Sequence, residues 1–116
     1  MVASAGCTGP LAGVKVVEMC QMISGPLAAQ YLADQGADVI KVENANGVGD
    51  RFRGSSNIPS PAFAFANRGK RSVTLDTKQE AGLVALKKLM QEADVFLQNF
   101  RPGVAERMGI GYDAAK

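Results

Sequence analysis

A strand, a helix and a second strand follow one another between residues 13 and 43, and this pattern constrains the fold more than any other feature. GVKVVEM (13–19) is a short β-branched run that predicts a buried strand. SGPLAAQYLADQG (24–36) predicts a helix, with a proline near its start and a glycine at its end. DVIKVE (38–43) predicts the next strand. Three such elements within about 30 residues indicate a βαβ unit with parallel strands and a right-handed crossover.

The second half of the chain repeats this alternation after a long irregular stretch. Residues 44–66 are rich in Asn, Gly, Ser and Pro, and they predict a loop that is longer than an ordinary connection between elements of a compact domain. RSVTLD (71–76) predicts a strand, and TKQE (77–80) predicts a capping box that opens a helix. DVFLQ (94–98) predicts the fourth strand, and a further helix is expected over residues 102–109.

Together these elements predict an α/β fold, with a Rossmann-like, open and mainly parallel sheet and flanking helices. We expect a flexible N-terminal tail at residues 1–10 and a partial Rossmann-like domain over residues 11–116. In such sheets, ligands bind outside the carboxyl ends of the strands. Three segments are expected to reach that edge: CQMIS (20–24), NANGVGD (44–50) and NFRPG (99–103).

The composition excludes several kinds of site. The sequence has no histidine, which excludes Ser-His-Asp and Cys-His catalysis and histidine metal sites from this chain. Its two cysteines cannot form a four-cysteine zinc site, and we expect no metal, reduced thiols and a cytoplasmic location. Cys20 is interpreted as a packing residue, because no histidine can activate it as a nucleophile. Glu18, Glu43 and Asp76 are interpreted as caps and ion-pair partners.

Several classes of partner are disfavoured. EMCQMISGP (18–26), at the end of the first strand, has a single glycine where the dinucleotide fingerprint needs three, and the Walker A pattern is absent. RNA binding is disfavoured because the predicted sheet carries aliphatic side chains rather than aromatic rings for stacking. A net charge of +2 is too small to argue for nucleic acid. No apolar run approaches the roughly 20 residues of a membrane span, so no membrane contact is expected.

A basic segment, NRGKRSVTLDTK (67–78), is a candidate anion site. Gly69 permits a turn with positive φ, so that the side chains of Arg68 and Lys70 can converge. Lys78 is expected in the first turn of a helix, where the macrodipole disfavours a cation unless an anion is bound nearby. The alternative interpretation is a solvated basic hairpin.

A second candidate is QNFRPGVAER (98–107), which connects a predicted strand to a predicted helix. Arg101 stands before that helix, where its guanidinium and the free backbone N–H groups could hold a phosphate together. Phe100 could stack on a heterocycle, or it could simply pack in the core.

Four blocks in order resemble the N-terminal part of the class III CoA-transferases, the CaiB/BaiF family, which includes formyl-CoA transferase and α-methylacyl-CoA racemase. These blocks are LAGVKVVEM…SGPLAAQYLADQGADVIKVEN, GD…RG, FANRGKRSVTLDTK and DVFLQNFRPGVAERMGIGYD. The resemblance covers nearly all of residues 10–116. It implies a Rossmann-like large domain and an interlocked homodimer.

The resemblance also implies an enzyme that moves coenzyme A between an acyl-CoA and a carboxylic acid acceptor. In this family an aspartate attacks the thioester and forms a mixed anhydride, which the returning CoA converts. That aspartate, like the His/Asp pair of the racemases, lies beyond residue 116. We therefore expect a chain truncated at its C-terminus, with no catalytic residue and no transferase activity alone. An acyl-CoA racemase and a non-catalytic nucleotide-binding module are the alternatives.

The resemblance further implies that coenzyme A contacts the ends of the strands and the helices that follow them. The implied contact residues are Ile23, Ser24, Asn44, Leu75, Asp76, Thr77, Lys78, Asn99, Phe100, Arg101, Val104 and Arg107. Asn44 departs from the family because some members carry an arginine there, against the adenine. Ile23 replaces the active-site glutamine of formyl-CoA transferases, which argues against formate or oxalate and for a bulkier or more apolar acyl group.

Overall fold

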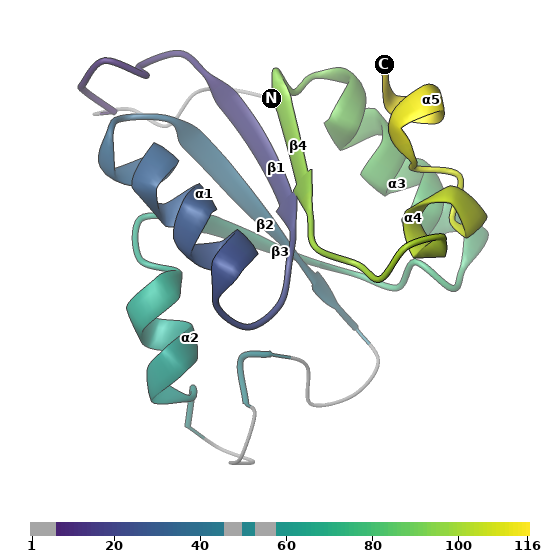
Figure 1. Cartoon of the computed structure of the whole chain (residues 1–116), viewed down its shortest axis with the longest axis horizontal. Helices are drawn as coiled ribbons and strands as arrows, with labels where there is room; N and C mark the ends of the chain where they lie inside the picture. Colours follow the sequence, from purple (N-terminus) through teal and green to yellow (C-terminus); the bar gives the residue numbers. More distant parts are fainter. Residues whose placement is uncertain (1–6, 46–49, 53–57) are drawn as a thin grey trace.

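The computed structural model describes residues 7–45, 50–52 and 58–116, in which strands alternate with helices (Figure 1). The strands are β1 (Lys15–Met19), β2 (Asp38–Asn44), β3 (Arg71–Leu75) and β4 (Val95–Gln98). The helices are α1 (Ser24–Asp34), α2 (Pro61–Ala66), α3 (Glu80–Gln91), α4 (Val104–Arg107) and α5 (Tyr112–Ala115). Residues 1–6 of the predicted N-terminal tail lie outside the described part of the chain.

The described strands form one parallel sheet with the order β3-β2-β1-β4. β1 is therefore flanked on both sides, and its Val16 stands in register with Val39 of β2 and Val95 of β4. The β-branched residues of β1 and β2 suit this position, because an inner strand of a parallel sheet that is covered by helices is buried on both of its faces. The predicted α/β fold with an open parallel sheet is confirmed.

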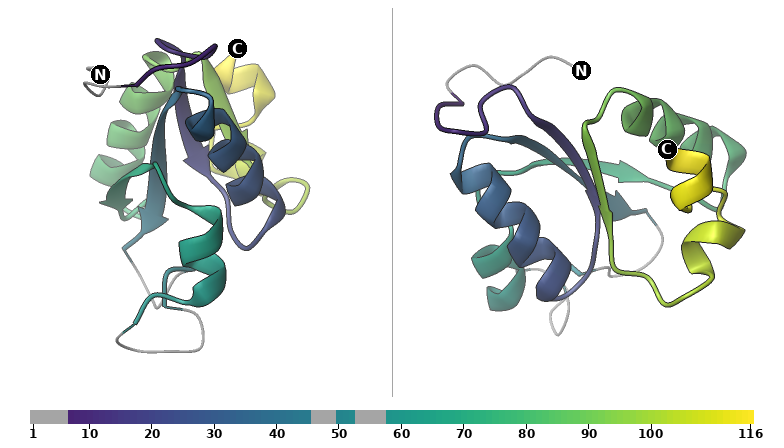
Figure 2. Two further views of the ribbon diagram at one scale, coloured as in Figure 1. Left: turned by 90° about the vertical axis from the view of Figure 1, so that its left-hand side faces the viewer. Right: turned by 45° about the horizontal axis from the view of Figure 1, so that its top comes forward.

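Helices cover the two faces of the sheet, and each face has its own apolar cluster. Val16 of β1 packs with Ala29 of α1 on one face. Its neighbour Val17 points to the other face and packs with Leu86 of α3, because successive side chains of a strand alternate between faces. Figure 2 shows α1 and α3 on opposite sides of the sheet. The core thus consists of two layers separated by the strands.

The long segment before β3 differs from the prediction, because it contains the short helix α2. Ser60 caps this helix by accepting a hydrogen bond from the N–H of Phe63 at 3.1 Å, and Pro61 occupies the first helical position. The Phe63 side chain is buried, and the guanidinium of Arg51 lies 4.4 Å from its ring centroid. A proline at the first helical position and one buried aromatic residue thus accompany the helix over residues 61–66.

The predicted capping box before α3 is wrong. The helix begins at Glu80 with Gln79 as its cap residue and without a side-chain cap. Asp76 instead accepts a hydrogen bond on Oδ1 from the N–H of Lys78 at 3.1 Å, which closes a turn before the helix. Lys78 therefore precedes the helix, and the expected conflict between its charge and the macrodipole does not arise in the first turn.

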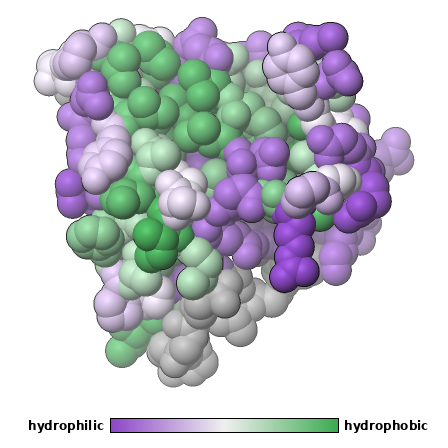
Figure 3. Space-filling view, in the orientation of Figure 1, coloured by the Kyte–Doolittle hydropathy of each residue, from purple (hydrophilic) through white to green (hydrophobic). Residues whose placement is uncertain are grey.

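Apolar side chains gather on the α1 side of the molecule (Figure 3). The cluster on this side includes half-buried leucines from three segments: Leu11 before β1, Leu32 of α1 and Leu97 of β4. β4 lies at the edge of the described sheet, so its apolar side chains are covered less completely than those of β1.

A fully buried carboxylate lies near the carboxyl end of β1. Glu18 is 0% exposed and forms two ion pairs. Its Oε1 accepts a hydrogen bond from Lys41 Nζ at 3.1 Å, and its Oε2 accepts one from Lys70 Nζ at 2.8 Å. Lys41 also donates to the carbonyl oxygen of Cys20 at 2.9 Å, and Lys70 to that of Pro26 at 2.8 Å. The predicted ion-pair role of Glu18 is confirmed. The cluster ties β2 and the turn before β3 to the two ends of the β1–α1 connection.

Replacement of Leu86 by alanine tests the α3 layer. Leu86 is fully buried, so Leu86→Ala is expected to leave a cavity and to lower the free energy of unfolding by about 2–5 kcal/mol. Val84 of the same helix is 45% exposed, and Val84→Ala is expected to change stability by only about 0.5 kcal/mol. Urea unfolding of both variants measures the difference, and equal effects would contradict the described layer.

Replacement of Glu18 by glutamine tests the buried charge cluster. Glu18→Gln removes the anion between two buried ammonium groups, and the expected loss in the free energy of unfolding is about 3–5 kcal/mol at pH 7. The matched control is Asp34→Asn, which breaks the exposed pair with Arg68 and is expected to cost less than about 1 kcal/mol.

The pH dependence of this variant gives a second readout. Burial already lowers the pKa of Lys70 below its ordinary value of 10.5, and loss of Glu18 removes an interaction that raises this pKa. Above the lowered pKa, the folded variant binds fewer protons than the unfolded chain, so its stability rises with pH towards 10.5. Urea titrations at several pH values should show the deficit shrinking as the pH increases. A deficit that grows with pH would contradict the assignment.

Candidate functional site

A hollow of about 600 Å³ opens at the carboxyl edge of the sheet, between the segments that follow β1 and β4. We call it the main hollow. Its lining residues are Gln21, Met22, Ile23, Ser24, Asn99, Phe100, Arg101 and Val104. The structure thus brings together two of the three segments that the sequence places at this edge, although nearly 80 residues separate them in the chain.

A second hollow of about 140 Å³ adjoins the first, and we call it the small hollow. Its lining residues are Met19, Cys20, Gln21, Val42, Asn44, Thr77, Phe100 and Met108. Gln21 and Phe100 line both hollows, so the two are contiguous. Asn44 from the end of β2 and Thr77 from the turn after β3 extend the candidate site across the sheet edge.

The predicted site residues divide into two groups. Eight of them line the hollows: Ile23, Ser24, Asn44, Thr77, Asn99, Phe100, Arg101 and Val104. Leu75, Asp76, Lys78 and Arg107 line neither hollow. Leu75 packs against the core on the α3 side, Asp76 and Lys78 form the turn before α3, and Arg107 is exposed at the end of α4.

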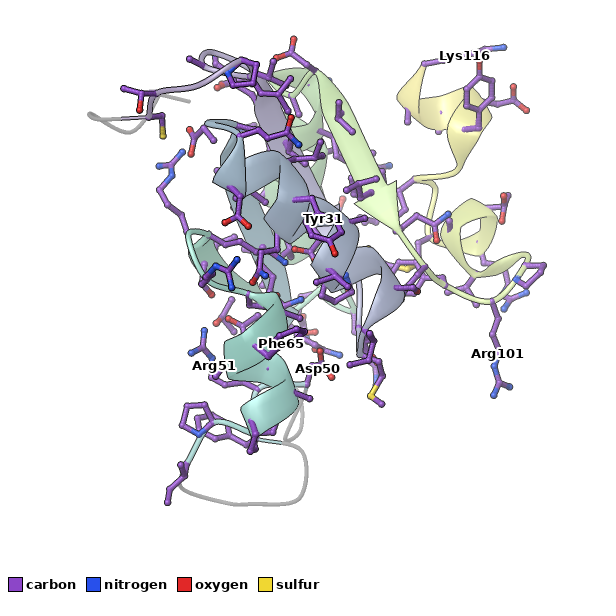
Figure 4. All side chains as sticks on the ribbon, turned by 60° about the vertical axis from the view of Figure 1, so that its left-hand side comes forward. Tyr31, Asp50, Arg51, Phe65, Arg101 and Lys116 are labelled. Carbon is purple, nitrogen blue, oxygen red and sulfur yellow. The ribbon has the colours of Figure 1, made fainter. Side chains whose placement is uncertain are left out.

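Phe100 and Arg101 supply the chemistry of the main hollow. Phe100 is half-buried against the α3-side core, as the core-packing interpretation predicts, and it also lines both hollows. Stacking of this ring on a heterocycle stays a prediction. Arg101 is exposed, and its side chain extends away from the ribbon (Figure 4). Within the described residues Arg101 forms no ion pair, in contrast to Arg51 and Arg71, which pair with carboxylates. Its guanidinium is therefore available to an anion at the rim.

The predicted anion site in the basic segment 67–78 is wrong at its centre. Gly69 has the expected positive φ of 77°, but the two flanking side chains turn to different carboxylates. Arg68 pairs with Asp34 at 2.9 Å, and Lys70 pairs with buried Glu18.

The remaining acidic residues hold structure together, as predicted. Glu43 receives Arg51 on both carboxylate oxygens, at 3.0 Å and 2.7 Å, and it also accepts from the hydroxyl of Ser72. Desolvation raises the pKa of Glu43, but these hydrogen bonds outweigh it, so the net pKa is lowered and the carboxylate stays ionised. An ionised, fully engaged carboxylate is suited to structure rather than to proton transfer.

Cys20 lies at the end of β1 and lines the small hollow. Burial, together with the nearby charge of Glu18, raises the pKa of its thiol to about 11. The thiol is therefore protonated at neutral pH, which agrees with its predicted role as a packing residue. Gly25 packs so closely that an added Cβ would lie 2.5 Å from the Cys20 sulfur, and this approach requires glycine. Neither cysteine of the chain is in a disulfide.

Three residues of this region are absent from the predicted contacts, although each lies in a segment that the sequence places at this edge. Gln21 and Met22 line the main hollow, and their place directly after β1 was the available signal. Asp50 lies in the quoted GD pair, but its partner, the N–H of Met22, could not be inferred from spacing. In the described ranges, no group of three or more His, Cys, Asp or Glu is placed to hold a metal ion. Those same residues contain no helix that is both long and apolar enough to cross a membrane.

Comparisons with known proteins identify the family. The sequence model of CoA-transferase family III matches residues 11–116. A formyl-CoA:oxalate CoA-transferase of Bradyrhizobium diazoefficiens is 44% identical over 110 residues, covering 91% of this chain and 26% of that protein. An (R)-2-hydroxy-4-methylpentanoate CoA-transferase of Clostridioides difficile is 41% identical over 112 residues, covering 91% of this chain and 28% of that protein.

Solved structures agree with the family model. The crystal structure of a CAIB/BAIF family protein from Brucella suis superposes with a TM-score of 0.83 at 39% identity, covering 92% of this chain and 30% of that one. The described fold is thus the fold of a little under a third of that protein. From the match of the family model to residues 11–116 and from these relatives, we conclude that the chain belongs to CoA-transferase family III.

Proposed function

We propose that this chain is the CoA-binding portion of an enzyme that transfers coenzyme A between an acyl-CoA and a carboxylic acid. The observation that carries the proposal is the main hollow, which joins residues 21–24 to residues 99–101 at the carboxyl edge of the sheet. The relatives named above are CoA-transferases, which favours transfer over the racemase and binding-module alternatives.

The chemistry of coenzyme A suits the residues that line the two hollows. The adenine is flat and apolar on its faces, and the half-buried Phe100 ring offers it a stacking surface. The phosphates are anionic, and the exposed guanidinium of Arg101 offers charge-assisted hydrogen bonds at the rim. We place Asn44 and Thr77 of the small hollow along the same ligand. Leu75, Asp76, Lys78 and Arg107 remain proposed contacts that would require the ligand to extend beyond both hollows.

The role of this chain in the reaction is to bind and orient coenzyme A. In the proposed chemistry an aspartate attacks the thioester carbonyl, forms a mixed anhydride and releases the CoA thiolate. We place that aspartate outside residues 11–116, within a longer, homodimeric and cytoplasmic enzyme. The CoA thiolate must stay near the mixed anhydride until the second carboxylic acid has replaced the first. A site that binds the nucleotide end of CoA keeps the thiolate there.

The acyl group is proposed to be bulkier or more apolar than formate. Met22 and Ile23 present apolar side chains to the main hollow and are 46% and 45% exposed. By the resemblance stated above, Ile23 stands where formyl-CoA transferases carry a glutamine. An amide side chain there can donate hydrogen bonds to a small acid, whereas isoleucine can contact only apolar atoms.

Titration of the chain with coenzyme A tests the proposal. Isothermal calorimetry should detect CoA binding, with NAD and an RNA oligomer giving no comparable heat. Arg101→Ala is expected to weaken CoA binding about 10-fold or more, because it removes charge-assisted hydrogen bonds to phosphate.

The matched control is Arg68→Ala. Arg68 is also an exposed arginine, but it pairs with Asp34 and lines neither hollow, so CoA affinity should stay within about 2-fold. Equal losses in the two variants would point to non-specific attraction of phosphate to basic protein. NAD binding as tight as CoA binding would favour the nucleotide-binding module.

A further inference from the structure

The connection between β1 and α1 contains a strained residue. Met22 has a φ of 67°, and within the described residues it is the one non-glycine residue with positive φ. An L-residue other than glycine is disfavoured there because its Cβ approaches the following carbonyl oxygen. Such a conformation persists when the surroundings hold it, and it is concentrated at ligand sites. Met22 lies in the wall of the main hollow.

Three side chains from distant parts of the chain hold the backbone of this turn. Asp50 Oδ2 accepts a hydrogen bond from the N–H of Met22 at 2.9 Å. Asn99 accepts from the N–H of Gln21 at 3.0 Å and donates to the carbonyl oxygen of Gln21 at 2.7 Å. Lys41, from the buried cluster, donates to the carbonyl oxygen of Cys20 at 2.9 Å. Three consecutive residues are therefore fixed through their main chain before any ligand is bound.

These contacts show that some residues hold the backbone of the turn while others line the hollow. Asn99 binds both the N–H and the carbonyl oxygen of Gln21, so part of its hydrogen-bonding capacity serves the turn. Asp50, labelled in Figure 4, lines neither hollow but acts on Met22, which does. The carboxylate reaches its target from a segment 28 residues further along the chain. It is well placed to control the shape of the wall without touching a ligand in the hollow.

We propose that Asp50 is a positioning residue for the CoA site, which holds Met22 in the left-handed conformation and so orients residues 22–24 along the main hollow. The proposal rests on the proposed function for the identity of the ligand. It assigns a role to the aspartate of the GD pair, which CoA binding alone leaves unexplained.

Glycine at position 22 makes the proposal testable, because glycine adopts positive φ without support. Asp50→Ala is expected to weaken CoA binding about 10-fold in the wild-type background, but less than about 2-fold in a Met22→Gly background. Asp50→Asn keeps an oxygen acceptor and should stay within about 2-fold of wild type. A direct contact with CoA, or a general role in stability, would give equal losses in both backgrounds, and that result would overturn the proposal.

Met22→Val provides a second route should Asp50→Ala fail to fold. A β-branched residue is poorly tolerated at positive φ, so this variant should weaken CoA binding about 10-fold although Asp50 is intact. Met22→Gly should bind CoA more tightly than Met22→Val. The reverse order would show that the Met22 side chain, rather than its backbone conformation, matters.

Nuclear magnetic resonance separates this proposal from the proposed function. A positive φ gives a strong nuclear Overhauser effect between the amide proton and the Hα of the same residue. This signal should be present at Met22 in the wild-type chain, lost in Asp50→Ala and kept in Asp50→Asn. Absence of CoA binding by the wild-type chain would refute the proposed function. If the signal persists in Asp50→Ala, Asp50 does not hold Met22 at positive φ, and the positioning role is refuted whatever the chain binds.

Discussion

The ion pairs of the Glu18 carboxylate with Lys41 and Lys70 are the interactions on which the site depends. The carboxylate lies fully buried between two ammonium groups, and a buried charge of this kind is tolerated only when its partners are in place. Those partners do more than neutralise it. Lys41 and Lys70 also donate to main-chain carbonyls on either side of the main hollow's β1–α1 wall, Lys41 to Cys20 directly after β1 and Lys70 to Pro26 in the first turn of α1. The electrostatic requirement of a single core residue therefore fixes the segment that forms one wall of the main hollow.

The fold was largely predictable from the sequence, because β-branched runs and helical spacing report local preferences directly. The edge that carries the site was predictable for the same reason, since parallel strands place their carboxyl ends together. Apart from the capping box, which is replaced by a local turn between Asp76 and Lys78, the failures involve longer-range partners. The helix at Pro61–Ala66 depends on a buried Phe63. Lys70 pairs with Glu18, a carboxylate 52 residues away, and does not converge with Arg68 on a bound anion. Nothing in the spacing of Asp50 indicates that it meets the backbone of Met22.

The relatives differ in the acids named for them although each matches nearly the whole of this chain. Formyl-CoA:oxalate, (R)-2-hydroxy-4-methylpentanoate and succinate–glutarate transferases are 37–44% identical to it. Coenzyme A is the component common to those names. This agrees with the proposal that the present segment holds the shared nucleotide, while the choice of acid depends on few residues here, such as Ile23, and on the remaining length of such enzymes.

The strand order carries a consequence for how such a site can change. From β1 the chain steps outward to β2 and β3 in one direction, whereas β4 adds to the opposite side of β1. The connection after β1 leads to α1 on one face, and the connection after β4 leads to α4, whose Ala105 packs on the other face. The two connections must therefore diverge, and a crevice opens where the direction of winding reverses. Its existence is a property of topology. Substitutions in its walls alter what fits there, but they need not create the opening.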